Sequence, residues 1–276
     1  MTNPSRGLGW KPDPVQPVLD RVDHDAAALL VTAPPVLPTA TDLRHLVVEI
    51  LDQGQLGSCV ANAGMQAIRM AHRAQTIADP TVPPLGSRLF GYYWARAFSG
   101  DVNRDEGTHL RDFFRGIAKY GFCPEAFWPY SDVRGVNARF CRLPGGNALR
   151  MAYDQHGGDF GYARIYDDTP AGRLTAIRQA VAAGYAVVFG TLVSETFCIG
   201  VGSVAVRAPT QKSDVIAGGH ALTIVGYGAD GTFTVANSWG PAWGVDGYCY
   251  FAPEYVSWEK SQDFWIVKNP PRFTAV

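Results

Sequence analysis

Small and apolar residues recur at helical spacing along the first two thirds of the chain. In residues 59–75 they line one face of a predicted helix and polar residues line the other. Ser58 precedes this stretch at the position where an N-cap is useful. Further helices are predicted over residues 87–97, over 108–120 ending at Gly121, and over 171–183 ending at Gly184.

Beyond Gly184 the pattern changes to short runs of β-branched and aromatic residues. These runs predict strands at residues 186–189, 221–225, 232–235 and 264–267. Asp230-Gly231 separates the second run from the third at the distance of a hairpin turn. The chain is therefore expected to adopt an α+β fold with a helical lobe and a strand-rich lobe, and a substrate would usually bind in the cleft between them.

Residues 1–40 differ from the remainder, because prolines deny them regular helix or central strand. We expect an extended N-terminal arm followed by one packed domain over residues 41–276. The first residues are polar and lack the apolar block of a secretory signal, so a cytoplasmic location is expected. Export by a signal-independent route is left open.

Composition and charge argue against several classes of function. The 276 residues include 24 Lys and Arg against 25 Asp and Glu, a net charge of −1, which argues against binding to nucleic acid or to a membrane surface. The histidines show no metal-ligand spacing. The acidic residues Asp101, Asp105 and Glu106 lack the spacing of a calcium loop and are interpreted as a solvated loop. No metal ion or cofactor is expected.

Cys59 is the first candidate for chemistry. It opens a predicted helix, where unpaired backbone amides and the helix dipole favour the thiolate, which is the nucleophilic form. The alternative is a small buried apolar residue, the commoner fate of a lone cysteine.

Two further segments favour the chemical role. His220 begins a predicted strand after two glycines, and Asn237 ends the strand that follows the hairpin, so the two residues are expected to be neighbours. An amide oxygen there would orient the imidazole, as thiol-based acyl transfer requires. The amide of Gln53, six residues before Cys59, and the Cys59 N–H would donate to the oxyanion of the attacked carbonyl.

These segments together resemble the papain family of cysteine peptidases. The resemblance rests on Gln53-Gly54-Gln55-Leu56-Gly57-Ser58-Cys59, on Gly219-His220-Ala221, and on Asn237-Ser238-Trp239-Gly240 with Trp243-Gly244 and Gly247-Tyr248. It also includes Glu106-Gly107-Thr108, which is similar to the strip that pairs with the substrate backbone. The similarity covers about four-fifths of the chain, from Asp42 to Val267.

The resemblance implies a papain-like two-lobed fold with a helical left lobe, an antiparallel β-barrel-like right lobe, and the active-site cleft between them. It implies Cys59 as nucleophile, facing His220 as an ion pair across the groove, with Asn237 orienting His220 and Gln53 in the oxyanion hole. It also implies that Gly107, Gly219 and Trp239 contribute to the substrate site, and that Trp239 shields the His–Asn bond from water. The implied partner is a peptide or protein substrate; a monomer is favoured.

The sequence departs from the family at Leu56, where members usually carry a disulfide cysteine. The disulfides of secreted members are therefore expected to be missing, in accord with a reducing compartment. A pair among Cys123, Cys141, Cys198 and Cys249 is left open.

Three functions are weighed. The main prediction is a cysteine peptidase that works through a thioester acyl-enzyme. The alternatives are a silent peptide-binding protein with the same fold and a thiol acyltransferase that uses the same intermediate. We also hypothesise that residues 1–38 lie against the domain and partly occlude the cleft, as in a zymogen.

Overall fold

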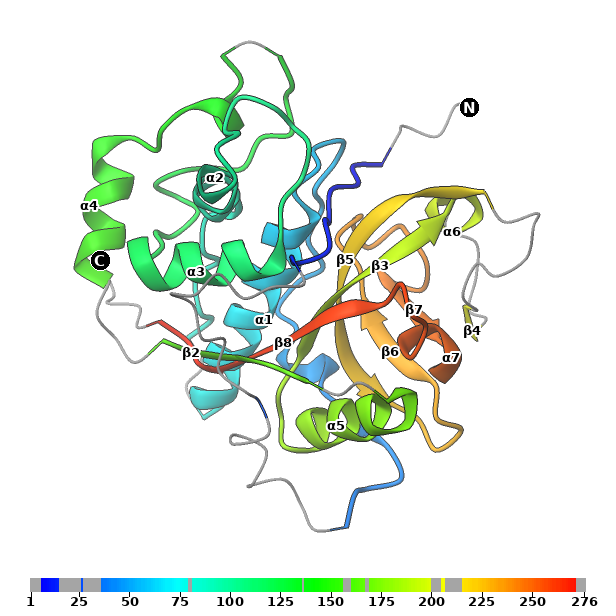
Figure 1. Ribbon diagram of the computed structural model, residues 1–276. Helices are drawn as coiled ribbons and strands as arrows, with labels where there is room; N and C mark the ends of the chain where they lie inside the picture. The colour runs from blue at the N-terminus through cyan, green and yellow to red at the C-terminus, as the bar shows by residue number, and fades with distance from the viewer. Residues whose placement is uncertain are drawn as a thin grey trace.

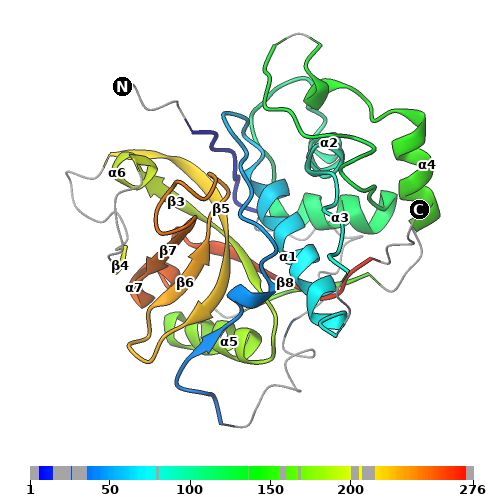
Figure 2. The ribbon, with the colours of Figure 1, turned by 180° about the vertical axis from the view of Figure 1, so that it is seen from behind.

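Helices and strands occupy opposite halves of the computed structural model (Figure 1). It describes residues 6–14, 26, 36–78, 81–135, 137–155, 160–166, 169–199, 205–206 and 215–271. The helical half carries α1 to α4, and the sheet of the other half is flanked by α5 and α7. Figure 2 shows the same division from behind, with α1 at the boundary. The predicted α+β architecture with two lobes is confirmed.

Helix α1 (Cys59–Gln75) has the bounds that the sequence predicts, and most of its side chains are buried. Its small residues permit close packing: a Cβ at Gly64 would lie 2.1 Å from the ring of Phe113. Ser58 stands at the N-cap position, but its side chain makes no capping bond. The Ser58 hydroxyl pairs instead with the hydroxyl of Tyr130 at 2.5 Å, so the predicted capping role is wrong.

The other three predicted helices are present as α2 (Arg88–Phe98), α3 (Leu110–Tyr120) and α5 (Pro170–Ala182). Ser87 caps α2 by accepting a hydrogen bond from the Phe90 N–H. Gly121 follows α3 with a φ of 70°, which suits glycine at a helix C-terminus. Helices that were not predicted are α4 (Gly146–Gln155), α6 (Glu195–Ile199) and α7 (Pro253–Val256), and single turns of 3-10 helix occur at η3 (Arg44–Leu46) and η4 (Arg139–Cys141).

One sheet forms the second half, with strand order β2-β8-β3-β5-β6-β7-β4 and β1 paired to β5. All neighbours are antiparallel except β4 and β7. The bounds are β1 (Thr41–Asp42), β2 (Gly161–Arg164), β3 (Val187–Ser194), β4 (Ala205–Val206), β5 (Ile216–Tyr227), β6 (Phe233–Ala236), β7 (Tyr248–Phe251) and β8 (Gln262–Asn269).

The hairpin between β5 and β6 turns at Asp230-Gly231, as predicted, with Gly231 at a φ of 84°. Strand β5 begins at Ile216, five residues before the predicted start, so His220 lies inside the strand. The two glycines before His220 have low strand propensity, yet they pair with Val193 and Leu192 of β3. Tertiary pairing therefore overrides local propensity here.

The arm passes between the two halves of the molecule. Residues 6–14, dark blue in Figure 1, run along the boundary between the helices and the sheet. The remainder of residues 1–40 lies outside the described residues apart from 26 and 36–40. In the described part of the chain, no helix combines the length and the apolar character that crossing a membrane requires.

Candidate active site

Cys59 lies at the first position of α1 and is completely buried. Burial raises the pKa of its thiol to about 11, and nearby backbone N–H groups of Ala221, Gly9, Val60 and Trp10 lower the pKa too little to offset this. Two of those groups belong to the arm. The thiol is therefore protonated at neutral pH in this structure.

His220 and Asn237 are joined across the hairpin, as the sequence predicts. The ring nitrogen Nε2 of His220 lies 2.8 Å from Oδ1 of Asn237. Trp239 stacks on the imidazole, with ring centroids 4.4 Å apart and planes at 23°. The other ring nitrogen, Nδ1, is buried and has no hydrogen-bond partner among the described residues.

Burial lowers the pKa of His220 to about 4, although its bond to Asn237 acts in the opposite direction. In this covered state burial thus favours the neutral thiol and the neutral imidazole over the predicted thiolate–imidazolium pair. The helix dipole favours the thiolate, but the cost of removing an ion from water is larger when the site is covered.

Gln53 is held by the residue that follows Asn237. Its Oε1 accepts a hydrogen bond from the Ser238 hydroxyl at 2.6 Å. Its Nε2 donates to the carbonyl of Leu56 at 2.9 Å and to the carbonyl of Gly7 in the arm at 3.0 Å. The amide predicted to bind an oxyanion therefore binds a peptide carbonyl of the chain's own arm.

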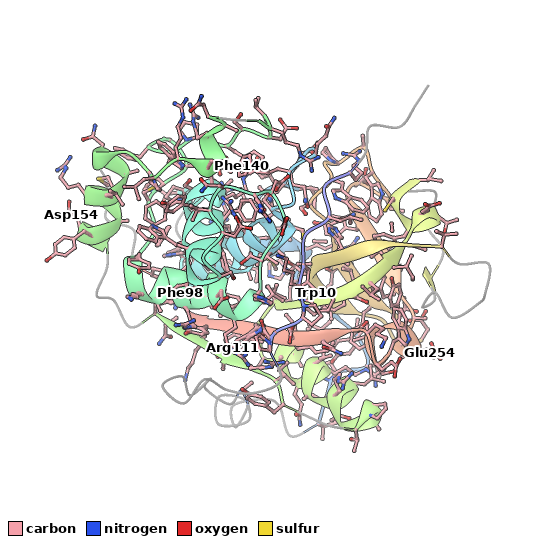
Figure 3. The ribbon with its side chains drawn as sticks, turned by 45° about the horizontal axis from the view of Figure 1, so that its top comes forward. Trp10, Phe98, Arg111, Phe140, Asp154 and Glu254 are labelled. Atoms are coloured by element: carbon pink, nitrogen blue, oxygen red, sulfur yellow. The ribbon has the colours of Figure 1, made fainter. Side chains whose placement is uncertain are left out.

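The arm lies along the cleft as an extended peptide. The Thr108 N–H donates to the Gly9 carbonyl at 2.8 Å, and the Lys11 N–H donates to the Thr108 carbonyl at 3.0 Å. On the opposite side, the N–H groups of Gly9 and Trp10 donate to the Gly219 carbonyl at 3.0 and 3.1 Å. Figure 3 shows Trp10 at the boundary between the helices and the strands.

Gly107 and Gly219, predicted at the substrate site, both contact this arm. Gly107 has a φ of 76°, and a Cβ there would lie 1.7 Å from the Gly9 carbonyl oxygen. A Cβ at Gly219 would lie 2.2 Å from the Trp10 carbonyl oxygen. Both positions need glycine because a peptide backbone approaches them closely.

Three residues of this site were missed from the sequence. Asp105 was interpreted as part of a solvated loop, but its carboxylate is mostly buried and accepts hydrogen bonds from the Gly57 N–H and the Tyr92 hydroxyl. It thereby holds the loop that precedes Cys59. Ser238 orients Gln53, and Trp10 fills part of the cleft. Ser238 is adjacent to a predicted residue, but no local signal identifies the other two.

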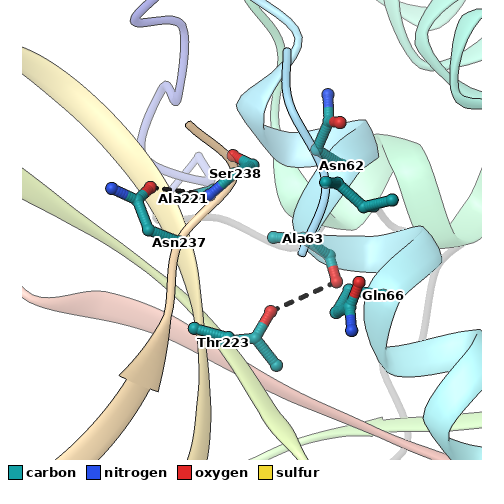
Figure 4. Close-up of a pocket in the computed structure, with 9 residues that line it drawn as sticks. Asn62, Ala63, Gln66, Ala221, Thr223, Asn237 and Ser238 are labelled. Carbon is teal, nitrogen blue, oxygen red and sulfur yellow. Dashed lines mark hydrogen bonds between the residues drawn. The ribbon is translucent and has the colours of Figure 1, made fainter. Parts of the chain in front are cut away.

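A small cavity lies behind Asn237, between β5 and α1 (Figure 4). Its walls include Gln66, Asn237 and Thr223, whose hydroxyl donates to the Ala63 carbonyl. The cavity volume of about 10 Å³ suits no more than one water molecule. The cavity is too small for a substrate. Of this cavity and the path of the arm, only the path of the arm accommodates a peptide.

All five cysteines are free, which answers the question left open for Cys123, Cys141, Cys198 and Cys249. Among the residues that the structure describes, no three His, Cys, Asp or Glu side chains cluster as metal ligands would.

Comparisons with known proteins agree on one family. A family model described as papain family cysteine protease matches residues 103–257, more than half of the chain. An uncharacterized peptidase C1-like protein of Acanthamoeba polyphaga mimivirus is 34% identical over 247 residues, which cover 86% of this chain and 76% of that protein. Vignain of Ricinus communis is 27% identical over 225 residues, and the match spans only 54% of its length.

A solved structure matches nearly the whole chain. The crystal structure of xylellain, a cysteine protease from Xylella fastidiosa, superposes with a TM-score of 0.79 at 31% identity. The match covers 97% of this chain and 98% of that chain. Procathepsin L 3 of Tenebrio molitor, at 18% identity and a TM-score of 0.65, supports the fold alone.

Proposed function

Because the chain belongs to the papain family of cysteine proteases, we propose that it hydrolyses peptide bonds with Cys59 as nucleophile, His220 as acid and base, Asn237 as orienting residue and Gln53 in the oxyanion hole. The chain is a cysteine peptidase that acts on peptides or proteins. The observation that supports this assignment of roles most is the 2.8 Å bond between His220 Nε2 and Asn237 Oδ1, which leaves Nδ1 as the free ring nitrogen.

The reaction follows from these groups. His220 Nδ1 takes the thiol proton while the Cys59 sulfur attacks the peptide carbonyl, and the negative oxygen accepts hydrogen bonds from Gln53 Nε2 and the Cys59 N–H. When the C–N bond breaks, the imidazolium returns the proton to the leaving amine, and a thioester remains. Water then gives a proton to His220 and attacks the thioester, which releases the acid and restores the thiol.

The arm must leave before this chemistry can occur. In the docked state Gln53 Nε2 is bound to Gly7, and both Cys59 and His220 are buried and neutral. We propose that the arm inhibits the enzyme by blocking the oxyanion hole and by excluding the water that stabilises an ion pair. The inhibitory segment was hypothesised to comprise residues 1–38. Within it, the contacts that residues 6–14 make support an inhibitory role.

The test compares the full-length chain carrying Trp10→Ala, a substitution that loosens the arm, with the same chain carrying in addition either Cys59→Ala or Cys123→Ala, a buried thiol elsewhere that serves as a matched control. A mixed peptide library is incubated with each protein, and products are identified by mass spectrometry. We expect Cys59→Ala to lose at least about a thousandfold in turnover and Cys123→Ala to retain it. Full cleavage by Cys59→Ala contradicts the proposal. Products that carry an added amine in place of water indicate an acyltransferase, and binding without cleavage indicates the silent peptide-binding protein.

A further inference from the structure

Trp10 fills a slot in the sheet half of the cleft. Three neighbouring strands form it, because Gly190 of β3 pairs with Gln262 of β8 on one side and with Ala221 of β5 on the other. A Cβ at Gly190 would lie 1.9 Å from Cε2 of the Trp10 indole, and one at Gly219 would lie 3.1 Å from Cε3. Only glycine at Gly190 leaves room for the ring.

A buried carboxylate closes the slot. Asp263 Oδ2 accepts hydrogen bonds from the Trp10 indole Nε1 at 3.2 Å and from the Asp13 N–H at 2.8 Å. Its Oδ1 is held by Arg164 at 2.6 Å. The backbone φ of Asp263 is 57°. Residues other than glycine rarely adopt this value, and it often marks functional positions.

The slot lies next to the reacting groups. Gly190 pairs with Ala221, which follows His220 in the chain and whose backbone N–H acts to lower the pKa of the Cys59 thiol. The Trp10 backbone N–H donates to the Gly219 carbonyl, next to His220, and also acts to lower the pKa of the Cys59 thiol, so the indole belongs to a residue close to the reacting groups. A substrate backbone that replaces the arm in this cleft would place one side chain in the emptied slot.

We propose that this slot selects a tryptophan side chain of the substrate and that Asp263 is the residue that recognises it, an inference that rests on the proposed peptidase function. Departure of the arm removes both donors from Asp263 Oδ2, and a new N–H donor is needed to replace them. An indole supplies that donor and fills the glycine-lined space. A phenylalanine ring fills the space but leaves the carboxylate oxygen unpaired.

The charges around the slot disfavour a basic side chain. Arg164 is bound to Asp263, and Arg111 also acts on this carboxylate. Asp13 leaves this cluster with the arm, whereas both guanidinium groups remain near Asp263. A third cation is repelled, and the expected order of preference is tryptophan, phenylalanine, then arginine.

The experiment uses the full-length Trp10→Ala protein, in which the slot is empty. A positional-scanning peptide library places Trp, Phe, Leu or Arg at each position on the acyl side of the cleaved bond, and kcat/KM is measured. We expect one position at which tryptophan exceeds phenylalanine by roughly tenfold. Adding Asp263→Ala is expected to reduce this ratio to about one, whereas adding the exposed control Asp154→Asn leaves the ratio unchanged.

A second variant tests the slot even if the Asp263→Ala protein does not fold. Gly190→Ala fills the slot and should lower kcat/KM for tryptophan and phenylalanine substrates at least about tenfold relative to those with alanine at that position. Gly146→Ala is the matched control, because a Cβ there meets no atom within 4 Å. Cleavage without a tryptophan preference, an arginine preference, or a preference that survives Asp263→Ala overturns the slot proposal. Absence of all cleavage and of Cys59 alkylation overturns the proposed function instead.

Discussion

The two walls of the cleft bind the same arm in different ways. On the helical wall, Thr108 holds the arm through backbone N–H and C=O groups, and Gly107 meets the Gly9 carbonyl with no side chain of its own. On the sheet wall the Gly219 carbonyl also accepts hydrogen bonds from the arm, but here side chains of the arm make contacts as well. Leu8 packs against Gly218, and Trp10 lies against Gly190 and ends at Asp263.

This difference separates two tasks. Backbone hydrogen bonds are available to every peptide, so the helical wall can hold and align any sequence. A pocket that surrounds a side chain distinguishes one residue type from another, because an unfilled space or an unpaired polar group carries a free-energy cost. Binding of peptide backbones in general is therefore shared by Thr108 and Gly219, and selection among side chains is assigned to the sheet wall.

The largest effect is expected at Gln53, the group on the helical side that contacts a backbone carbonyl. Gln53→Ala removes an oxyanion donor and should lower kcat by about 10²–10³ for every peptide alike, since each presents the same carbonyl. Gln55→Ala, an exposed neighbour, serves as the control. Steady-state kinetics on peptides with different side chains measure the effect. A loss confined to KM, or to one class of peptide, contradicts this assignment.

The next effect concerns Trp10, the main side-chain contact on the sheet wall. Trp10→Ala removes a ring that is 5% exposed, at a cost of about 3 kcal/mol of docking free energy. Displacement of the arm should then be roughly a hundredfold more frequent. The rate of Cys59 alkylation by iodoacetamide reports this opening, with Val36→Ala at an exposed position of the same arm as control. An unchanged alkylation rate would show that Trp10 does not hold the arm.

Local pattern predicted those parts of the site that local structure determines. The small residues of α1 define a buried helix that starts at Cys59, and Asp230-Gly231 fixes the hairpin that joins His220 to Asn237. Strands β2 and β7 were not predicted, because their four-residue runs have too little pattern and are stabilised by pairing with β8 and β6.

Long-range contacts explain the remainder. The Trp10–Asp263 bond joins residues 253 positions apart, and no periodicity in the sequence encodes it. The protonation states of Cys59 and His220 depend on burial by this distant arm. Asp105 was misinterpreted for the same reason, since its partner Gly57 lies 48 positions away.

A smaller effect is expected from pH. Burial, with the neighbouring carboxylate of Asp263 on β8, raises the pKa of Asp13 from 3.8 to about 8 in the docked arm, although Arg164 of β2 and Arg111 of α3 act against this. The Asp13 carboxyl is thus protonated in the docked arm at pH values at which it is ionised in the released arm. Docking should therefore be strongest near pH 4 and weaken as the pH rises toward 8, by about tenfold or more in total.

The measurement is the Cys59 alkylation rate of the unmodified chain divided by that of Trp10→Ala at each pH, because this ratio cancels the titration of the thiol itself. The ratio should rise with pH. Asp13→Asn cannot ionise, and its ratio should remain flat. A ratio that falls with pH would mean that the arginines, rather than burial, control the ionisation of Asp13.

The smallest effect is expected at the side chain of Thr108, although both the N–H and the C=O of this residue bind the arm. Its N–H and C=O make the bonds to the arm, whereas its buried hydroxyl has no hydrogen-bond partner among the described residues. Thr108→Val keeps the shape and the backbone bonds and removes only that hydroxyl. We expect the alkylation rate and the peptide preferences to change by less than about twofold. A tenfold change, or an altered side-chain preference, would show that the helical wall also selects side chains, and the division of tasks between the two walls would then be wrong.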